Sequence, residues 1–404
     1  MLKVVEKADG STATKVLIKS AESIKLPPGC SLSLVTTLRS VAHLKQDWRA
    51  LEDECDIQPT IFQSYDWVQS WCEIYAQPDS KREIQFVIGR RANRVVFIWP
   101  LMRERQHGVS VLKWASHPIG QYGDLLVAAF EDTAEWISAA TQYLKVNRSA
   151  DILHLRHVRK TSNFAPYAQL HWNDGRLFEQ APAMDLTQFK SDEDYSARYD
   201  AQQRKRRKKT FRKLEELGQL TTKIATENEA PAALALAVSE KLKWLETRGR
   251  FNQVLSCSRH NELLEKLIAN PDAKMRVKIL QISLGDQPSA WEIGFEWNGI
   301  HYGYLTSHLD GLTDLGVGRL TLDIAQRQAL KSGLREYDLM VPYDQHKESF
   351  SSHKEPVNDW FLPLSSKGSL YGTFYLRLTR PTLREIYRRL PPPVLRVLKR
   401  LLGQ

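Results

Sequence analysis

The residues most able to support chemistry lie in the stretch 300–350, where glycines follow a strand-like run. The run ends at His308, and a short loop leads to Gly316 and Gly318, where a helix is expected to begin. Unpaired backbone N–H groups at a helix start bind anions, and glycines let a phosphate approach the backbone. The spacing matches neither the Gly-x-Gly-x-x-Gly fingerprint nor the Gly-x-x-x-x-Gly-Lys-Ser/Thr phosphate loop. A glycine-rich turn that binds nothing therefore stays open as an alternative to an anion site.

The elements that must position this stretch alternate between strand-like and helix-like segments. In the first half we expect strands over residues 32–38, 84–89, 95–100, 109–115, 124–128 and 152–156, and helices over 44–55, 67–75 and 132–145. In the second half we expect helices over 192–217, 230–248, 261–268 and 318–332, and strands over 274–284, 289–297, 300–308 and 337–341. The pair Asn298-Gly299 predicts a hairpin turn. This alternation indicates an α/β (α+β) layer structure, and the similar order in the two halves could be an internal duplication.

Length and cysteine usage narrow the class of protein. The chain has 404 residues, which suggests about two domains. It contains no run of about 18 apolar residues, and its start lacks the pattern of a secretory signal, so we expect a cytoplasmic protein. Cys30, Cys55, Cys72 and Cys257 form no C-x-x-C pair. We therefore expect neither a metal site nor a disulfide framework.

Positive charge is concentrated in two segments. The chain holds 57 Lys and Arg residues against 47 Asp and Glu residues, a formal net charge of +10. Residues 198–213 and 366–404 each hold nine basic residues and one acidic residue, so each nets +8. The rest of the chain is therefore mildly acidic. The first segment is either a solvated helix face or a binding surface for an anionic substrate or nucleic acid.

The second basic segment has the apolar spacing of an amphipathic helix. Leu383, Ile386, Tyr387 and Leu390 follow the i, i+3, i+4, i+7 pattern, and apolar residues continue it after the prolines 391–393. Two short basic helices broken by proline suit an anionic membrane surface, where each basic residue contributes about 1 kcal/mol. Packing on the protein's own core stays an equal alternative, and an anionic regulator could also bind there.

The order of motifs in the stretch 300–350 resembles the acyl-CoA motif of GNAT-superfamily N-acyltransferases. A strand is followed by Gly316-Val317-Gly318-Arg319, a helix, a second strand at Tyr337, and then His346-Lys347 and Phe350. More narrowly, the order resembles the CelD-like branch, named for a cellulose-biosynthesis acetyltransferase domain and related to FemAB-type peptidoglycan transferases. The chain departs from that branch at two positions. Val317 precedes the motif glycine, where a small residue or proline is usual, and Phe350 stands where a tryptophan is common.

Features outside this motif are similar to the same branch. An aromatic segment holds Trp67 and Trp71, a strand ends at residues 100–101, and the basic helix 204–213 precedes the second half. The resemblance covers residues 32–362 and implies tandem GNAT-like domains, each a mixed central sheet flanked by helices. The expected parts are a polar tail (1–30), an N-terminal GNAT-like domain (31–180), a C-terminal acyl-CoA-binding domain (181–365) and a basic amphipathic tail (366–404).

The resemblance also implies where an acyl-CoA co-substrate, most simply acetyl-CoA, binds without a metal. Its pyrophosphate would lie on the N–H groups of the glycine loop, and its pantetheine arm would pair with the preceding strand. The residues concerned are Tyr302, Leu305, Ser307, Leu315, Gly316, Val317, Gly318, Arg319 and Leu320.

An acceptor amine that attacks the thioester must lose a proton, so a base is needed near the strand ends. The candidates are Glu292, His308, Asp310 and Asp344, and Tyr304 could protonate the departing thiolate. Each of three candidates has a structural alternative. Glu292 could simply face solvent, His308 could have a structural role, and Tyr304 could be a core residue. Substrate contacts are expected from Trp67, Trp71, Arg204, Arg207, His346 and Lys347.

The predicted function is N-acylation of an amino sugar or of a polysaccharide or lipid-linked precursor. The enzyme would be cytoplasmic, and residues 381–404 are the segment that could attach it peripherally to the inner membrane. One alternative is a FemAB-like transferase that uses aminoacyl-tRNA, for which the basic helix could bind the RNA; no other nucleic acid is expected as a partner. The other alternative is a non-enzymatic, membrane-docked accessory protein of exopolysaccharide synthesis.

Overall fold

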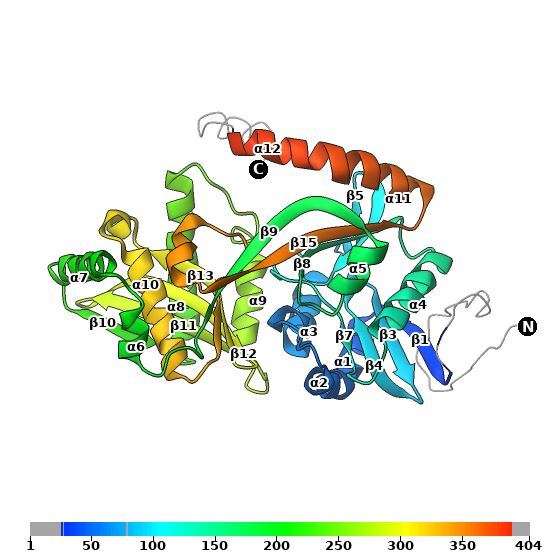
Figure 1. Ribbon diagram of the computed structural model, residues 1–404, viewed down its shortest axis with the longest axis horizontal. Helices are drawn as coiled ribbons and strands as arrows, with labels where there is room; N and C mark the ends of the chain where they lie inside the picture. Colours follow the sequence, from blue (N-terminus) through cyan, green and yellow to red (C-terminus); the bar gives the residue numbers. More distant parts are fainter. Residues whose placement is uncertain (1–25, 27, 78–79, 390–404) are drawn as a thin grey trace, which may run out of the picture.

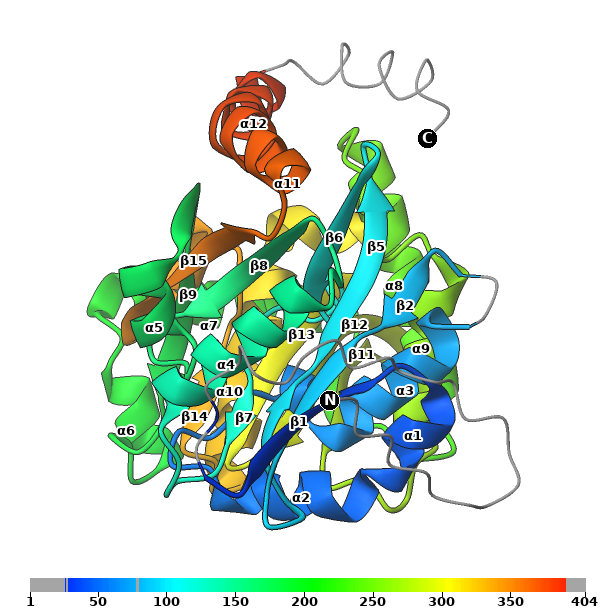
Figure 2. The same ribbon diagram turned by 90° about the vertical axis from the view of Figure 1, so that its right-hand side faces the viewer.

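The computed structural model describes residues 26, 28–77 and 80–389, and in this part the strands form two sheets (Figures 1 and 2). The strands are β1 (Cys30–Val35), β2 (Arg82–Ile84), β3 (Phe86–Arg91), β4 (Arg94–Trp99), β5 (Leu101–Gln106), β6 (Val109–Trp114), β7 (Leu126–Val127), β8 (Ile152–Arg159), β9 (Asn173–Asp185), β10 (Leu220–Ile224), β11 (Arg276–Leu284), β12 (Gln287–Trp297), β13 (Ile300–His308), β14 (Glu336–Asp338) and β15 (His353–Pro363). The smaller sheet has the order β1-β3-β4-β7, and the larger one the order β10-β11-β12-β13-β14-β9-β15-β8-β6-β5-β2.

Helices flank these sheets, which confirms the predicted mixed α/β class. They are α1 (Leu38–His43), α2 (Lys45–Glu54), α3 (Tyr65–Tyr75), α4 (Thr133–Val146), α5 (Ala165–His171), α6 (Asp192–Ala197), α7 (Ala201–Glu215), α8 (Ala230–Thr247), α9 (Ser258–Ile268), α10 (Val317–Lys331), α11 (Ser366–Leu370) and α12 (Arg380–Arg389). Short 3-10 turns are η2 (Ile61–Gln63), η3 (Asp310–Leu315) and η4 (Gln345–Phe350), and η5 (Tyr371–Thr379) is a π-helical segment.

The same strand–helix–strand unit occurs once in each half of the large sheet. In the N-terminal half, β6 pairs in parallel with β8 and α4 connects them. In the C-terminal half, β13 pairs in parallel with β14 and α10 connects them. Both parallel pairings are short, and β13 meets β14 only over Ile300–Tyr302. The two strands of each pair are therefore free to diverge beyond that point.

The two halves exchange the strand that follows this unit. β9 comes after β8 in the chain but pairs with β14 of the other half, whereas β15 comes after β14 but pairs with β8. β9 and β15 also pair with each other, in antiparallel register from Ala183↔His353 to Asn173↔Phe361. Figure 1 shows both strands crossing the middle of the molecule, so one continuous sheet joins the halves.

A helix built from residues 366–389 follows β15 and crosses the molecule above the exchanged strands (Figure 1). One of its faces is packed, because Tyr371 and Leu376 are buried. Two glycines permit the close approach: a Cβ on Gly368 would lie 1.8 Å from the carbonyl oxygen of Asp151, and one on Gly372 would lie 2.5 Å from the ring of Phe361. The helix thus rests on the N-terminal half of the sheet.

Several sequence expectations need correction. The helix expected over 192–217 is two helices, because Ser191 caps α6 and Asp200 caps α7 in a capping box with Gln203. Strands β5, β9, β10 and β15 were not predicted. For the tail, the sequence leaves two alternatives open, and Tyr371 and Leu376 show that part of residues 366–389 packs on the protein itself. The second amphipathic segment after the prolines, and nearly all of the polar tail 1–30, lie outside the described residues.

We expect Gly368→Ala to loosen the helix at 366–389. Replacing glycine by alanine inside a helix ordinarily stabilises it by about 1 kcal/mol, but a Cβ only 1.8 Å from the Asp151 carbonyl forces backbone apart, at a cost of about 1–3 kcal/mol. Hydrogen exchange should therefore speed up across residues 366–389. Gly311→Ala is the control, since a Cβ there meets nothing within 4 Å. Unchanged exchange in Gly368→Ala would contradict the packing.

Candidate active site

A cavity of about 480 Å³ lies between the start of α10 and the basic helix α7. Its wall includes Leu315, Gly316, Arg319 and Leu320 from the predicted phosphate loop. Helix α7 contributes four basic side chains to the wall: Arg206, Arg207, Lys209 and Lys213. With Arg319 the wall holds five cations, and its one carboxylate is Asp314. The fold thus brings two features that are far apart in sequence into one positively charged pocket.

The start of α10 borders this pocket with Gly316 and Arg319, and its first backbone N–H groups have no partner within the helix. The first hydrogen bonds of the helix run from the N–H groups of Arg319 and Leu320 to the carbonyl of Gly316, at 3.2 and 3.3 Å. The N–H groups of Val317 and Gly318 therefore precede the hydrogen-bonded turns, as at any helix start. Gly316 has a φ of 80°, a left-handed conformation that favours glycine. Partial positive charge at this end makes it suited to an anion.

Helix α7 is fixed on α10 by part of its own positive charge. Arg207 forms an ion pair with Asp323 of α10 and lies 4.0 Å from the ring centre of Tyr199. Burial lowers the pKa of Arg207. Arg204, the other basic residue expected to touch substrate, donates to the carbonyl of Tyr199. Within the described residues, Arg206, Lys209 and Lys213 form no ion pair, so these three cations remain for a ligand.

Strand β13, which packs against α10, has an open edge. Its pairing with β14 ends at Tyr302, yet the strand continues to His308, so within the described residues the edge from Gly303 onward pairs with no other strand. On the opposite side, its register with β12 steps from Leu305↔Ile293 to Gly303↔Gly294, which leaves Tyr304 as the extra residue of a β-bulge. The open backbone groups could pair with an extended ligand.

The bulge places Tyr304 beside a histidine that the sequence did not point to. The Tyr304 hydroxyl and Nε2 of His260 share a hydrogen bond of 2.9 Å. Burial lowers the pKa of His260 to about 4, and burial raises the pKa of Tyr304 above its usual value. Near neutral pH the imidazole is uncharged and the phenol keeps its proton. Only the tertiary contact reveals this pair, because 44 residues separate the two in the chain.

Glu292, a predicted base, is engaged in a buried cluster. Its carboxylate is 1% exposed and accepts hydrogen bonds from the Tyr337 hydroxyl and from Nε2 of His301, both at 2.9 Å. Burial alone would lower the pKa of His301, but the charge of Glu292 raises it to about 9. The histidine is therefore cationic at neutral pH. This ion pair is a structural element of the sheet, and we no longer propose Glu292 as a base.

His308 lies at the end of β13 against the start of α10. A Cβ on Gly318 would be 3.6 Å from its ring. Its Nδ1–H donates to the carbonyl of Leu309 at 3.0 Å, so Nε2 carries the available lone pair. Burial lowers the pKa of His308, which keeps it neutral at pH 7. Asp310, by contrast, is paired with Arg248 at 3.1 Å.

The residues after β14 are tied into their own turn. Asp344 caps η4 and lies 3.1 Å from Nδ1 of His346, and both side chains are exposed. The Lys347 ammonium donates to the carbonyls of Leu339, Met340 and Pro342 at 2.9–3.0 Å. Because these three bonds use all three of its N–H donors, Lys347 holds the chain rather than a substrate.

The two tryptophans expected to touch substrate are core residues. Trp67 is 0% and Trp71 1% exposed. They lie on α3, whose start is capped by the Ser64 hydroxyl, and Trp67 packs edge-on against Phe295 of β12. Trp67 thus helps to join the halves, and we include neither tryptophan in the proposed site.

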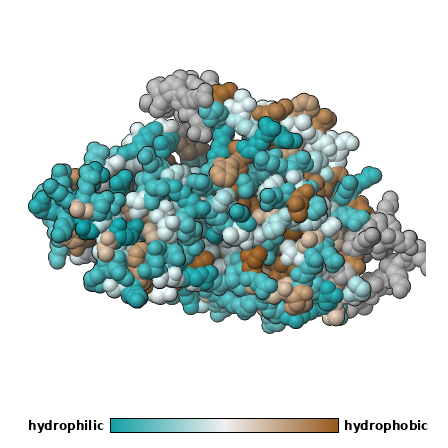
Figure 3. Space-filling view, in the orientation of Figure 1, coloured by the Kyte–Doolittle hydropathy of each residue, from teal (hydrophilic) through white to brown (hydrophobic). Residues whose placement is uncertain are grey.

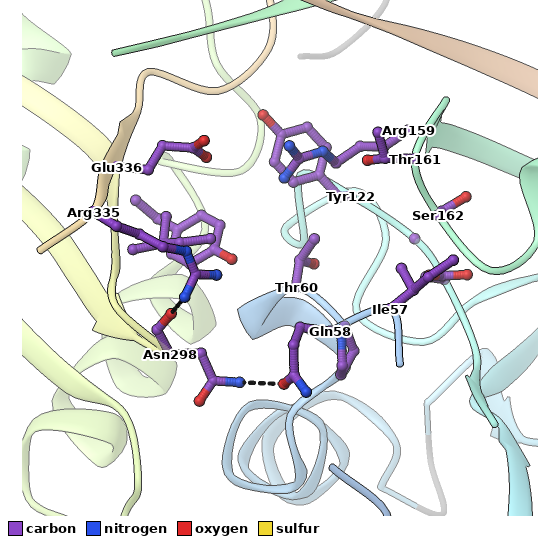
Figure 4. Close-up of a pocket in the computed structure, with 15 residues that line it drawn as sticks. Ile57, Gln58, Thr60, Tyr122, Arg159, Thr161, Ser162, Asn298, Arg335 and Glu336 are labelled. Atoms are coloured by element: carbon purple, nitrogen blue, oxygen red, sulfur yellow. Dashed lines mark hydrogen bonds between the residues drawn. The ribbon is translucent and has the colours of Figure 1, made fainter. Parts of the chain in front are cut away.

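A smaller cavity of about 210 Å³ opens between the halves at the other end of β13, near Ile300 (Figure 4). On one side, the Arg159 guanidinium lies 3.4 Å from the carboxylate of Asp338. On the other side, the Asn298 amide donates to Gln58 at 2.9 Å. These wall groups therefore already have partners within the protein, and the contact between Asn298 and Gln58 joins the two halves.

Among the described residues, no group of three or more His, Cys, Asp or Glu side chains is arranged to hold a metal ion. In the same part of the chain, no helix is both long and apolar enough to cross a membrane.

Comparison with known proteins identifies the class of the C-terminal half. Residues 201–348 match the family model of the acetyltransferase (GNAT) domain. This range begins with α7 and ends in η4, so it contains most of the pocket wall, the open edge of β13 and the start of α10. Residues 201–348 are thus similar to a GNAT-type acetyltransferase domain, and this part of the chain has a GNAT acyltransferase fold.

Solved structures extend the likeness of fold to most of the chain. FemX is similar with a TM-score of 0.54 at 9% identity, over 82% of this chain and 98% of FemX. A conserved protein of unknown function from Bacteroides thetaiotaomicron is similar with a TM-score of 0.51 at 8% identity, over 82% of this chain and all of that one. A search of curated protein sequences finds no significant relative. At such identities the likeness shows a shared fold, and it does not confirm the CelD-like branch.

The His301–Glu292 pair should make stability depend on pH. The pKa of His301 is raised from about 6.5 in an unfolded chain to about 9, so the pair contributes fully below pH 6.5 and its contribution is lost as pH rises through 9. We expect a loss of about 3 kcal/mol in unfolding free energy between pH 6.5 and 10. Denaturant titrations should show this loss in the wild type and not in His301→Gln.

The matched control for this measurement is His353→Gln, which removes an exposed histidine 3.7 Å from Glu336. Its pH profile should follow that of the wild type. Parallel profiles for the wild type and His301→Gln would show that the buried pair does not carry the charge described.

Proposed function

We propose that the chain is an acyl-CoA-dependent N-acyltransferase, most simply an N-acetyltransferase, whose donor binds in the α7–α10 pocket and along β13. The observation that carries the proposal is the joint position of the α10 start, the unpaired cations of α7 and the open edge of β13. Phosphates bind at helix starts and to cations, whereas an amide-containing arm needs strand-like backbone partners. Acetyl-CoA carries both kinds of group in one extended molecule.

In the proposed reaction, the acceptor nitrogen bonds to the acyl carbon while the carbon–sulfur bond breaks. The nitrogen loses one proton and the departing sulfur gains one. Tyr304, which keeps its proton at neutral pH, would donate to the sulfur and be held in place by His260. His308, neutral and with Nε2 available, is the candidate that would accept the proton of the amine through water.

The acceptor that we propose is an amino sugar or a polysaccharide or lipid-linked precursor. This part of the proposal rests on the resemblance of the motif order to the CelD-like branch. The same resemblance includes FemAB-type transferases, so aminoacyl-tRNA is the second candidate donor. One observation favours it: the outer side of α7 forms a further basic groove lined by Arg204, Lys205, Lys208 and Arg212, which suits a nucleic-acid backbone.

Donor binding tests the proposal directly. We expect Arg319→Gln to weaken acetyl-CoA binding about fivefold, because one phosphate contact at the α10 start is lost. Calorimetry should show the change. Lys331→Gln, which removes the same charge at the far end of the same helix, should have no effect. If acetyl-CoA fails to bind at millimolar concentration while charged tRNA binds, the aminoacyl-tRNA alternative replaces the proposal.

We also propose that the protein associates peripherally with the cytoplasmic face of an anionic membrane. The outer face of the helix at 366–389 exposes a row of large apolar side chains, each more than half exposed: Leu370, Phe374, Leu378, Leu383 and Ile386. Figure 3 shows apolar atoms along the upper edge of the molecule, over this helix. Basic residues such as Arg377 and Arg384 accompany them, as in interfacial helices.

Vesicle binding tests this location. The double variant Leu383→Ser with Ile386→Ser should lower partition onto vesicles containing phosphatidylglycerol by roughly tenfold, because two side chains no longer enter the interface. Leu236→Ser, which changes an exposed leucine on α8, is the control. Equal partition of all three proteins would refute membrane docking. Vesicle binding without acyl transfer to any amine would instead support the accessory-protein alternative.

A further inference from the structure

A second basic cavity, of about 700 Å³, lies beneath the helix at 366–389. Three parts of the chain build its wall. The N-terminal half supplies side chains of β6 and β8, the start of α9 belongs to the C-terminal half, and the helix at 366–389 supplies Tyr371, Tyr375 and Arg380. The cavity is distinct from the α7–α10 pocket, because the two have no wall residue in common.

Positive charge exceeds negative charge on this wall. It carries five cations, Arg82, Lys113, Arg156, Arg259 and Arg380, against one carboxylate, Glu104. Glu104 forms an ion pair with Lys113 and lies 3.9 Å from Arg82. A cavity with this imbalance attracts an anion and repels a metal ion or an ammonium group.

Two of these cations are held in a fixed orientation from behind. Asp359 of β15 is 1% exposed and lies 2.9 Å from Nε of Arg156 and 3.3 Å from Nη1 of Arg380. Burial alone would raise the pKa of Asp359, but the charges of Arg156 and Arg380 lower it to about 2. Asp359 is therefore ionised, and it orients two guanidinium groups that come from different parts of the chain.

Neutral histidines accept further hydrogen bonds from the same groups. Nε2 of His117 lies 3.2 Å from Nη1 of Arg156, and Nε2 of His154 lies 3.2 Å from Nη1 of Arg380. Burial and the adjacent arginines lower the pKa of both histidines well below the usual value. All contacts of the Arg380 side chain with the described residues use Nη1, so Nε and Nη2 remain for a ligand.

Two independent features of the wall also lack a partner. The Tyr371 hydroxyl is buried and has no hydrogen-bond partner among the described residues. α9 starts at the cavity with Cys257 as its N-cap, and no side chain caps this helix start. A ligand with several oxygen atoms would supply what both lack.

The position of the cavity connects it with the reaction. Ser258 and Arg259 line it, and the next residue is His260, whose ring holds Tyr304 at the bulge of β13. A molecule anchored by an anionic group in the cavity would therefore extend past the start of α9 toward the place where the acyl group is transferred.

We infer that this cavity is an oxyanion site, and that it takes the phosphate or diphosphate group of the acceptor. Guanidinium groups in fixed orientation bind phosphate oxygens through paired hydrogen bonds. The neutral histidines orient these groups and add no charge of their own. Its role as an acceptor site rests on the proposed acyl transfer, whereas the binding of the oxyanion does not. A soluble sugar phosphate and a lipid-linked diphosphate share this chemistry.

The binding test uses inorganic pyrophosphate and the full chain, measured by calorimetry with and without saturating CoA. Arg380→Gln and Arg259→Gln should each raise the Kd for pyrophosphate roughly fivefold, since each removes a charge-assisted contact. Lys367→Gln, which removes one positive charge at the start of the same helix outside the cavity, should leave the Kd unchanged. Arg259 is exposed, so its variant remains informative even if Arg380→Gln disturbs the helix. Equal affinities in all variants, or no binding at millimolar pyrophosphate, would overturn the site.

A kinetic test then distinguishes this site from the proposed function. Acetyl transfer to glucosamine 1-phosphate should have a lower KM than transfer to glucosamine, and Arg259→Gln should remove the difference. Vesicles carrying a polyprenyl diphosphate, compared with vesicles carrying the polyprenol, separate the lipid-linked source from the soluble one. Pyrophosphate binding without any acyl transfer would reject the proposed function and keep the oxyanion site. Acyl transfer with equal KM values for both sugars would reject the acceptor role.

Discussion

The antiparallel pairing of β9 with β15 is the interaction on which the rest of the structure depends. Each strand belongs by sequence to one half and by pairing to the other, so neither half has a complete sheet alone. The helix at 366–389 begins only after β15, and it rests on the sheet that the exchange completes. The relative position of the two basic cavities is therefore fixed by backbone hydrogen bonds rather than by surface contacts between two separate domains.

The same geometry explains why a site arises in each half. The parallel pair β6–β8 extends over two residue pairs and the pair β13–β14 over three. The other edges of β8 and β14 pair with the exchanged strands β15 and β9. Beyond that point the strands diverge, and polar side chains or open backbone groups occupy the gap. In the C-terminal half the gap adjoins the start of α10, and in the N-terminal half it adjoins half-buried arginines. One repeated unit thus adjoins both basic cavities.

Local signals in the sequence predicted the elements around the C-terminal site well. The Asn298-Gly299 turn has both φ angles positive, and α10 begins one residue after Gly316, because turn and cap residues act over a few positions. β9 and β15 escaped prediction since their partners are more than 150 residues away and each contains a proline and several charged residues. The same holds for His260 and for the cavity below the C-terminal helix: a sequence shows residue types, but only the exchanged sheet shows which of them meet.

The strand exchange has a consequence for how the chain acquires its structure during synthesis. The edge of β8 that pairs with β15 stays open until residue 363 has left the ribosome, although β8 itself is complete by residue 159. For some 200 residues of elongation the nascent N-terminal half therefore exposes the edge of a hydrophobic sheet, the kind of surface to which other strands add. Contacts between such distant segments also form slowly, since the loop must close before they can stabilise it. The architecture that unites the two cavities thus makes folding a late event, because the sheet is complete only after β15 has been synthesised.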